Sequence, residues 1–377
     1  MALIVPYLVT GYSIFLLRHT GDNGCGRSAP MAAAMPIEHV VIIVKENHTF
    51  DCYFGTFPGA DGVTGLPRAL DQPPSDPRHD HAAWLRRADP PPHGARREQY
   101  LEADIPAYFA YARRYVLCDN YFTAVASQSE PNHLMLIAAT SPIIDNSSAH
   151  RTFQPRPPFN VPSLPTSLEA KGLTWRNYGG FYHQHIAALA HSPHNVSSDD
   201  FDRDIDAGTL PSVSWLYASE SHGHGRGGGQ SEHPTDSVSA GMRWTVERVN
   251  RVAQSAYWER TVIFITWDDW GGWFDHVEPP LAEQWTGGGP LGYHDSQFRF
   301  GPRVGCLVIS PYAKRNHLSS VTSGPTAVRS HASLVRFCMT VFGLAPLGDI
   351  DAAADDMSDC FDFARRRTDR PSEVPGR

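Results

Sequence analysis

The sequence predicts an α/β fold in which a central, mostly parallel sheet is flanked by helices on both faces. Two near-continuous apolar runs have strand length and no polar alternation, namely residues 37–44 and 261–266. This pattern is typical of central strands that are buried on both faces. Segments with helical spacing separate these and other short apolar runs, as expected when helices connect parallel strands. We expect one domain, since 377 residues can bury a large core.

The order of the predicted strands and helices along the chain supports this fold class. After the strand at 37–44, the chain predicts a Pro-rich surface loop at 66–97, helices at 105–115 and 125–140, strands at 172–178 and 212–217, a helix at 241–256, the strand at 261–266, a strand at 301–311 and a helix at 330–344. The residues after these elements read as a polar C-terminal tail. The domain is therefore expected to span 36–348, with the tail at 349–377.

The N-terminal residues favour a leader or signal-like segment at 1–35. Residues 2–17 are apolar but short for a membrane span, and no basic residue precedes them. Small residues at 32–34 offer a cleavage site, whereas Met35 directly before the first strand also fits a non-structural leader. A signal would make the protein secreted or periplasmic. Without a signal, it would be cytoplasmic.

The composition narrows the function classes. A formal net charge of −8 leaves no basic footprint for a nucleic-acid partner. The six cysteines are scattered without a CxxC pair, so they indicate neither a zinc motif nor a disulfide framework. No protein partner is evident from the sequence.

Oxygen-bearing side chains follow both of the predicted central strands. Asp268 and Asp269 come after one strand, and Glu46 and Asn47 come after the other. Ligands of open α/β sheets collect at the carboxyl ends of strands, and hard oxygen ligands there suggest a divalent cation. The acidic pair alone could be a solvated turn, and Glu46-Asn47 alone could cap a helix. Together, the four residues could form an oxygen site.

Two serines precede the helix predicted at 125–140. Ser127 and Ser129 lie where free backbone N–H groups and the helix dipole favour an anion. Pro131 suits the first turn of a helix, which puts Ser129 at its mouth. A serine at this point could attack a phosphate, although most serines in such positions only cap helices.

As a set, several motifs resemble a bacterial and plant phosphoesterase family. The motifs occur in the family's order over roughly 37–344: KENHTFDCYFGTFPGADG, DPRHDH, DIPAYFAYARRYVLCDNYF, SQSEPNHLMLIAAT, SEHP, TWDDWGGWFDHV, GPRVGCLVISPYA and HASLVRF…FGL. The family contains non-haemolytic phospholipases C and acid phosphatases, and it belongs to the alkaline phosphatase superfamily. The resemblance implies a three-layer, alkaline-phosphatase-like sandwich.

The resemblance also implies a metal site and a nucleophile. Glu46, Asn47, Asp268 and Asp269 match metal ligands, and Ser129 matches the nucleophile that also binds the metal. One divalent ion is expected. Oxygen ligands favour Ca²⁺ or Mg²⁺, and Zn²⁺ is also compatible because carboxylates can ligate it.

Four histidines and Asn132 are expected to contact the substrate. His79 and His233 match residues of the phosphate pocket and are candidates for protonating the leaving group. His183 or His185 could add a further contact, and Asn132 is also expected to bind substrate.

Some positions depart from the family pattern. The usual Arg-Ser and His near the first motif are replaced by His48, Thr49 and Cys52. The usual Asp before His331 is Ser330, which weakens any role for that histidine.

The expected function is metal-dependent hydrolysis of a phosphoric ester through Ser129, of the phospholipase C type, on a phospholipid at a membrane surface. Acid phosphatase activity on small phosphomonoesters is the alternative within the enzyme class. A catalytically inactive protein that binds a phospho-ligand is the alternative outside it. An acyl-transfer hydrolase is disfavoured because the sequence has no GxSxG motif, and the C/S-x-P-x-R context of a sulfatase is absent too.

Overall fold

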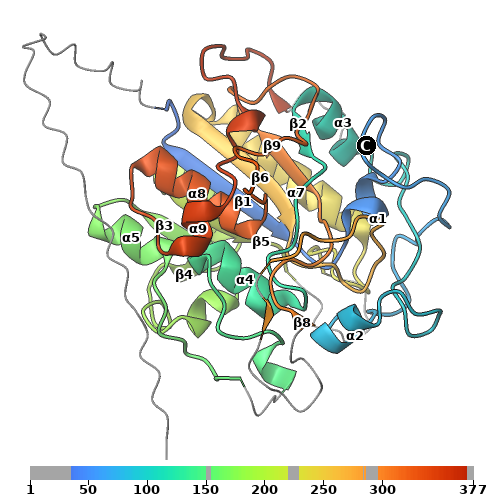
Figure 1. Ribbon diagram of the computed structural model, residues 1–377. Coiled ribbons are helices and arrows are strands. Elements are labelled where there is room, and N and C mark those ends of the chain that lie inside the picture. The colour runs from blue at the N-terminus through green and yellow to red at the C-terminus, as the bar shows by residue number, and fades with distance from the viewer. Residues whose placement is uncertain (1–34, 150–153, 220–228, 283, 286–295, 372–377) are drawn as a thin grey trace, which may run out of the picture. The chain divides into compact units, whose positions relative to one another are not determined.

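The computed structural model describes residues 35–149, 154–219, 229–282, 284–285 and 296–371. The described residues form one compact unit. At its centre is an eight-stranded sheet with the order β10-β2-β9-β6-β1-β5-β3-β4 (Figure 1). Its strands are β1 (His39–Lys45), β2 (Val116–Cys118), β3 (Trp175–Tyr178), β4 (Asn195–Val196), β5 (Val213–Tyr217), β6 (Thr261–Trp267), β9 (Cys306–Ile309) and β10 (His317–Leu318). A separate two-stranded sheet contains β7 (Gln284–Trp285) and β8 (Ser296–Gln297).

The sheet is mostly parallel, which confirms the predicted fold class. Strand β9 is the exception, because it runs antiparallel to both β2 and β6. Strand β1 lies between β5 and β6 and is parallel to both. In the register of β1 with β6, Lys45 is paired with Trp267, the last residue of β6. The segments that follow these two strands therefore leave the sheet side by side.

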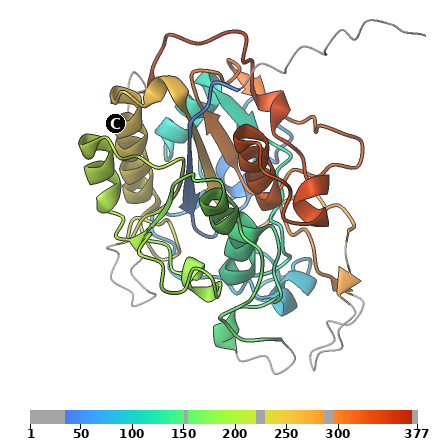
Figure 2. The ribbon, with the colours of Figure 1, turned by 90° about the vertical axis from the view of Figure 1, so that its left-hand side faces the viewer.

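Helices cover both faces of the sheet, so the fold has three layers. Figure 2 shows α6 and α7 on one side of the strands and α4 and α8 on the other. Both faces of β1 and β6 are buried by these layers, which explains why neither strand alternates between apolar and polar residues. The helices are α1 (Phe50–Phe54), α2 (His81–Leu85), α3 (Pro106–Arg114), α4 (Ser129–Ala138), α5 (Leu164–Ala170), α6 (Asp200–Ala207), α7 (Val238–Gln254), α8 (His331–Phe342) and α9 (Asp349–Ala353).

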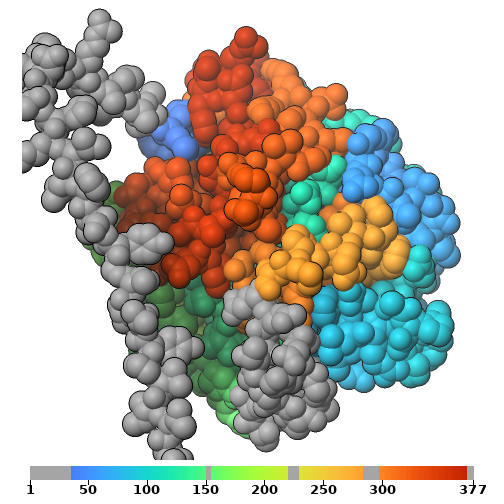
Figure 3. Space-filling view, in the orientation of Figure 1, coloured from blue at the N-terminus to red at the C-terminus, as the bar shows by residue number. Residues whose placement is uncertain are grey.

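The segment after residue 348 belongs to the domain and is not a separate polar tail. Helix α9 packs against α8, and Phe361 stacks on Phe337 of that helix with ring centroids 5.1 Å apart. The buried carboxylate of Asp355 pairs with Arg329 at 2.8 Å. Figure 3 shows this segment, in red, at the surface beside the orange residues that precede it. The predicted boundary at 348 is therefore corrected, and the domain continues at least to residue 371.

The fold does not test the predictions for the N-terminus. Residues 1–34 lie outside the described residues, so the leader or signal stays a prediction. Within the described part of the chain, no helix has the length and apolar character that crossing a membrane requires. The described cysteines are free and buried.

Candidate functional site

The carboxyl ends of β1 and β6 bring the four predicted metal ligands to one place. Glu46 and Asn47 follow β1 directly, and Asp268 and Asp269 follow β6. The backbone N–H of Asn47 donates to Oδ1 of Asp268 at 2.9 Å. All four side chains are buried. The structure thus assembles a dense group of buried oxygen atoms where the sequence predicted a site.

The glycine pair after Asp269 permits this close assembly. Gly271 and Gly272 both have positive φ angles, 58° and 76°. A β-carbon on Gly271 would lie 2.1 Å from the carbonyl oxygen of Asn47, and one on Gly272 would lie 2.7 Å from that of Arg78. Only glycine fits such an approach without moving the backbone. The N–H of Gly271 also donates to Oδ1 of Asp269 at 2.6 Å, which fixes that carboxylate.

Ser129 is the serine that faces the acidic group. It is the first residue of α4, and its Oγ donates to Oδ2 of Asp269 at 3.1 Å. Ser127 is fully buried, and its Oγ donates to Oδ1 of Asp145 at 2.7 Å. The two hydroxyls therefore serve different carboxylates. Only the contact of Ser129 belongs to the site.

Asn132 shapes the turn that carries Ser129. Its Oδ1 accepts from the N–H of Val125 at 2.8 Å, and its Nδ2 donates to the carbonyl oxygen of Gln128 at 2.9 Å. Its Nδ2 also lies 3.1 Å and 3.4 Å from the carbonyl oxygens of Val125 and Ser127. The amide is fully used inside this turn and buried. Asn132 thus has a structural role in the turn that carries Ser129, and its predicted contact with substrate stays a prediction.

His133 is a site residue that the sequence interpretation missed. Its Nε2 lies 3.4 Å from Oε1 of Glu46 and 3.4 Å from Oδ2 of Asp268. The side chain is 2% exposed, and neither ring nitrogen has a hydrogen-bond partner. The sequence could have indicated His133, because a residue four positions after Ser129 lies on the same face of a helix.

The adjacent carboxyl groups of Asp268 and Asp269 have pKa values that are shifted in opposite directions. Burial raises the pKa of a carboxyl group, but at Asp268 the interactions with His133 and the N–H of Asn47 outweigh it and hold the pKa below the usual range. At Asp269, burial and the neighbouring charge of Asp268 hold the pKa well above its ordinary value. Of the two adjacent carboxylates, Asp269 is therefore the one that lacks a compensating positive charge.

The donor atoms fit a divalent cation. Within the described ranges, Oδ1 of Asn47 and Oδ2 of Asp268 are buried without a hydrogen-bond partner, which is costly for polar atoms. Next to them are the Asp269 carboxylate and Ser129 Oγ. Buried carboxylate and amide oxygens of this kind are typical metal ligands. A cation would satisfy the orphaned oxygens and offset the excess negative charge.

His79 reaches the site, whereas the described contacts of His233 lie within its own loop. Nδ1 of His79 bonds to the carbonyl oxygen of Pro77 at 2.7 Å, while Nε2 lies 3.3 Å from Nδ2 of Asn47 and 3.9 Å from Oδ2 of Asp269. In this arrangement, the Asn47 amide donates to His79, which leaves its Oδ1 free. Nδ1 of His233 bonds to the carbonyl oxygen of Pro234 at 2.6 Å.

The other two predicted histidines differ from each other. His183 is buried between Trp175 and Trp215, and burial lowers its pKa to about 3. It is therefore a neutral core residue, and its burial argues against the predicted substrate contact. Nδ1 of His185 pairs with Oε1 of Glu130 at 2.7 Å, next to Ser129 in the sequence. Of the two predicted alternatives, His185 thus lies beside the first turn of α4, and its contact with substrate stays a prediction.

His331 supports the site despite the serine before it. Its Nε2 contacts the carbonyl oxygen of Asp268 at 2.5 Å, and its Nδ1 lies 3.1 Å from the hydroxyl of Tyr121. Burial lowers its pKa to about 4, so the ring is neutral near pH 7. His331 therefore holds the backbone of an acidic residue and does not itself face the donor atoms.

Comparison with known proteins identifies the family of this chain. The model of the phosphoesterase family matches residues 37–79 and 77–345, which include all of the site residues described above. This chain belongs to the phosphoesterase family. The resemblance drawn from the motifs is thereby confirmed.

Curated phosphoesterase relatives carry phospholipase C names. The Non-hemolytic phospholipase C of Pseudomonas aeruginosa is 27% identical over 90% of this chain, which spans 59% of that protein's length. Phospholipase C A of Mycobacterium tuberculosis is 26% identical, with 87% of this chain and 78% of the relative covered. Non-specific phospholipase C1 of Arabidopsis thaliana is 25% identical, with 82% and 67% covered.

Solved structures similar to this phosphoesterase are distant. A protein in the alkaline phosphatase superfamily from Vibrio parahaemolyticus matches with 10% identity and a TM-score of 0.46, over 85% of this chain and 70% of the other. The murine ectonucleotide pyrophosphatase / phosphodiesterase 5 matches with 9% identity and a TM-score of 0.44, over 84% and 99%. We draw no functional conclusion from similarity at this level.

Proposed function

We propose that this phosphoesterase is a metal-dependent hydrolase of phosphoric esters that uses Ser129 as its nucleophile. The observation that carries the proposal is the position of Ser129 Oγ, 3.1 Å from Oδ2 of Asp269 at the first turn of α4. A hydroxyl at this point meets both a buried acidic group and the amino end of a helix. The dipole of that helix favours an oxygen that is becoming negative.

The chain's own residues prepare this nucleophile. Asn132 fixes the turn before α4, so that the Ser129 hydroxyl points at Asp269 and donates its hydrogen bond there. Glu46, Asn47, Asp268 and Asp269 would hold the divalent ion. When bound, such an ion lowers the pKa of a hydroxyl and offsets charge on phosphoryl oxygens.

The reaction proceeds in two displacements at phosphorus. Ser129 Oγ attacks in line, the new Oγ–P bond forms, and the bond from phosphorus to the leaving oxygen breaks. The serine proton passes toward Asp269, and the leaving oxygen takes a proton from a histidine. Water then attacks the phosphoserine and releases phosphate or its monoester.

His79 is the favoured proton donor because its ring reaches the acidic group. Its Nδ1 stays bonded to the carbonyl oxygen of Pro77, and Nε2 is directed toward Asn47 and Asp269. For this role Nε2 must carry a proton, so the Asn47 amide, which donates to it in the resting structure, has to give way. The described contacts of His233 stay within its own loop, which makes it the second candidate.

The proposed substrate is the phosphodiester of a phospholipid at a membrane surface. The support comes from relatives named phospholipase C in two bacteria and in a plant. For a chain that works on such a surface outside the cytoplasm, we propose that residues 1–35 direct secretion.

The test compares Ser129→Ala with Ser127→Ala on phosphatidylcholine, p-nitrophenyl phosphate and the choline ester of the latter. Loss of the nucleophile is expected to lower kcat on the order of 10³-fold or more. Ser127→Ala should lower it far less, because its hydroxyl serves only Asp145. Turnover of the two choline esters alone supports the phospholipase C type, and turnover of p-nitrophenyl phosphate alone supports a phosphatase. An inactive wild-type protein that still binds these esters would overturn the enzyme assignment.

A further inference from the structure

The acidic group contains one imidazole that hydrogen bonding does not explain. His133 is almost completely buried, and neither of its ring nitrogens has a hydrogen-bond partner among the residues that the structure describes. Buried polar atoms are almost always paired, so an unpaired imidazole needs a reason. Its Nε2 is directed toward Glu46 and Asp268, two of the residues that would hold the ion.

The distances around Nε2 are those of weak ion pairs, longer than a charge-assisted hydrogen bond. A charged N–H donor and a carboxylate are normally about 2.7–2.9 Å apart. Nε2 instead lies 3.4 Å from an oxygen of Glu46 and 3.4 Å from an oxygen of Asp268. Two ligands that are each about 2.1 Å from one ion lie roughly 3.0 Å apart at an octahedral angle and roughly 3.4 Å apart at a tetrahedral one. Both distances from His133 are therefore compatible with ligands of a shared ion, and the ligand atoms of the three side chains all lie within 4.8 Å of one another.

The ring is also held in this direction. Its centroid is 4.8 Å from that of Tyr182 and 5.4 Å from that of Tyr217. His133 lies four residues after Ser129, so both are presented by the same face of α4. One helix would thus bring both the nucleophile and a nitrogen ligand to the ends of β1 and β6.

We propose, building on the proposed function, that His133 Nε2 is a metal ligand and that the resident ion accepts nitrogen, as Zn²⁺ does. Ca²⁺ and Mg²⁺ take oxygen ligands, whereas imidazole is a common ligand of Zn²⁺ and other first-row transition metals. The oxygen ligands on Glu46, Asn47, Asp268 and Asp269 alone favoured Ca²⁺ or Mg²⁺. Adding an imidazole reverses this preference.

The experiment loads the full chain with one equivalent of Zn²⁺ and records X-ray absorption at the zinc K-edge. The wild type should show the scattering of one imidazole, and His133→Gln should lose it. His79→Gln is the matched control, because Nε2 of His79 is occupied by the Asn47 amide. That variant should keep the imidazole signal.

Chelator competition supplies a second readout. Loss of a residue that only supports a ligand lowers metal affinity about 10–100-fold, so loss of a ligand should lower the Zn²⁺ affinity at least about 100-fold. The affinity of His133→Gln for Mg²⁺ should not fall, because glutamine offers an oxygen. If His133→Gln does not fold, the wild-type spectrum and the His79→Gln spectrum still decide.

The outcomes separate this inference from the proposed function. A wild type that hydrolyses phosphoesters but binds Zn²⁺ without imidazole, or binds none, overturns the inference and leaves the function standing. Zinc bound through an imidazole that His79→Gln removes also overturns it. Zinc bound through His133 in a protein that hydrolyses no phosphoester upholds the inference and overturns the function.

Discussion

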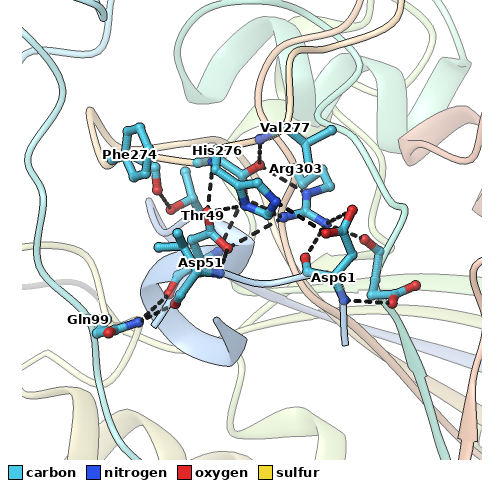
Figure 4. Close-up of polar contacts among 11 residues, drawn as sticks. Thr49, Asp51, Asp61, Gln99, Phe274, His276, Val277 and Arg303 are labelled. Atoms are coloured by element: carbon cyan, nitrogen blue, oxygen red, sulfur yellow. Dashed lines mark hydrogen bonds and ion pairs between the residues drawn. The ribbon is translucent and has the colours of Figure 1, made fainter. Parts of the chain in front are cut away.

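Two clusters of buried acids lie at the same end of the sheet, and they are neutralised in different ways. We call the first the metal cluster, which contains Glu46, Asp268 and Asp269. The second, the arginine cluster, contains Asp51, Asp275, His276 and Arg303 (Figure 4). Each cluster draws acids from the segment after β1 and from the segment after β6. Sequence position alone therefore does not distinguish them.

The arginine cluster contains its own cation. The guanidinium of Arg303 is buried, and it donates to Oδ1 of Asp275 at 2.9 Å and to Oδ1 of Asp51 at 3.4 Å. Figure 4 shows His276 and Arg303 between Asp51 on one side and Asp61 on the other. The remaining donors of Arg303 reach the carbonyl oxygens of Asp61 and Asp119 at 2.8 Å and 2.7 Å. This cluster is complete without a metal.

In the described part of the chain, the Asp268 and Asp269 carboxylates have no comparable partner. Among the described residues, only histidine rings come within ion-pair distance of the Asp268 and Asp269 carboxylates. The nearby ammonium of Lys45 is engaged with Glu232 at 3.3 Å. Two groups of acids with similar burial thus differ in whether the protein itself supplies a neutralising cation. The better indicator of a metal site is a buried acidic group without an internal cation.

The largest effect is expected from removing the internal cation of the arginine cluster. Arg303→Gln leaves Asp51 and Asp275 buried without their counter-ion, which should cost about 3–5 kcal/mol of unfolding free energy. Denaturant unfolding measures this loss. The double variant Arg303→Gln/Asp275→Asn should regain part of it. A loss below about 1 kcal/mol, with no recovery in the double variant, would show that Arg303 does not neutralise this cluster.

Removal of the metal should lower the stability of the fold by a smaller amount. The loss should arise only at the metal cluster. At a free metal concentration 100 times the Kd, binding to the folded state stabilises it by about 2.7 kcal/mol. A chelator should therefore lower the Tm, and added divalent ion should restore it.

Two variants make this second test specific. In Asp268→Asn, the chelator should change the Tm less, and phosphoester turnover should fall along with metal binding. In Asp275→Asn, the response to metal should stay as in the wild type, because the arginine cluster is expected to bind none. If the chelator changed the Tm equally in both variants, the two clusters would not differ in metal binding.

The residues of the metal cluster were predictable because they follow strands. The carboxyl ends of two adjacent parallel strands meet, so Glu46, Asn47, Asp268 and Asp269 had to be close. Ser129 was predictable from Pro131 in the first turn of a helix. His133 was missed because it starts the apolar run HLMLIA, which reads as a helix facing the core. Its spacing of four from Ser129 was the available signal.

Other features depend on tertiary contacts that no local pattern contains. The apolar run at 301–311 predicted a strand, but its period says nothing about the antiparallel direction of β9. The C-terminal segment has few apolar residues, yet Met357, Cys360 and Phe361 are all buried. The arginine cluster was missed for a similar reason, since Arg303 lies 28 residues from Asp275.

The smallest effect concerns the pH response of the arginine cluster. Burial alone would lower the pKa of His276, but the hydrogen bond and charge of Asp51 outweigh it and raise the pKa above 6.5. Asp275 and Asp61 also face this ring, and Arg303 opposes its charge. Because the folded pKa is raised, protonated His276 stabilises the fold fully below about pH 6.5. This contribution disappears as the pH rises through the raised pKa.

His276→Gln tests this response against His191→Gln, which changes an exposed histidine outside the cluster. The ring of His276 is 30% exposed, so solvent screens its ion pair and the loss at pH 6 should be about 1 kcal/mol or less. The gap in unfolding free energy between wild type and His276→Gln should narrow between pH 6 and pH 8. The gap for His191→Gln should stay flat. A gap for His276→Gln that widens with pH would mean that the neutral ring is the stabilising form, and that Arg303 alone neutralises Asp51 and Asp275.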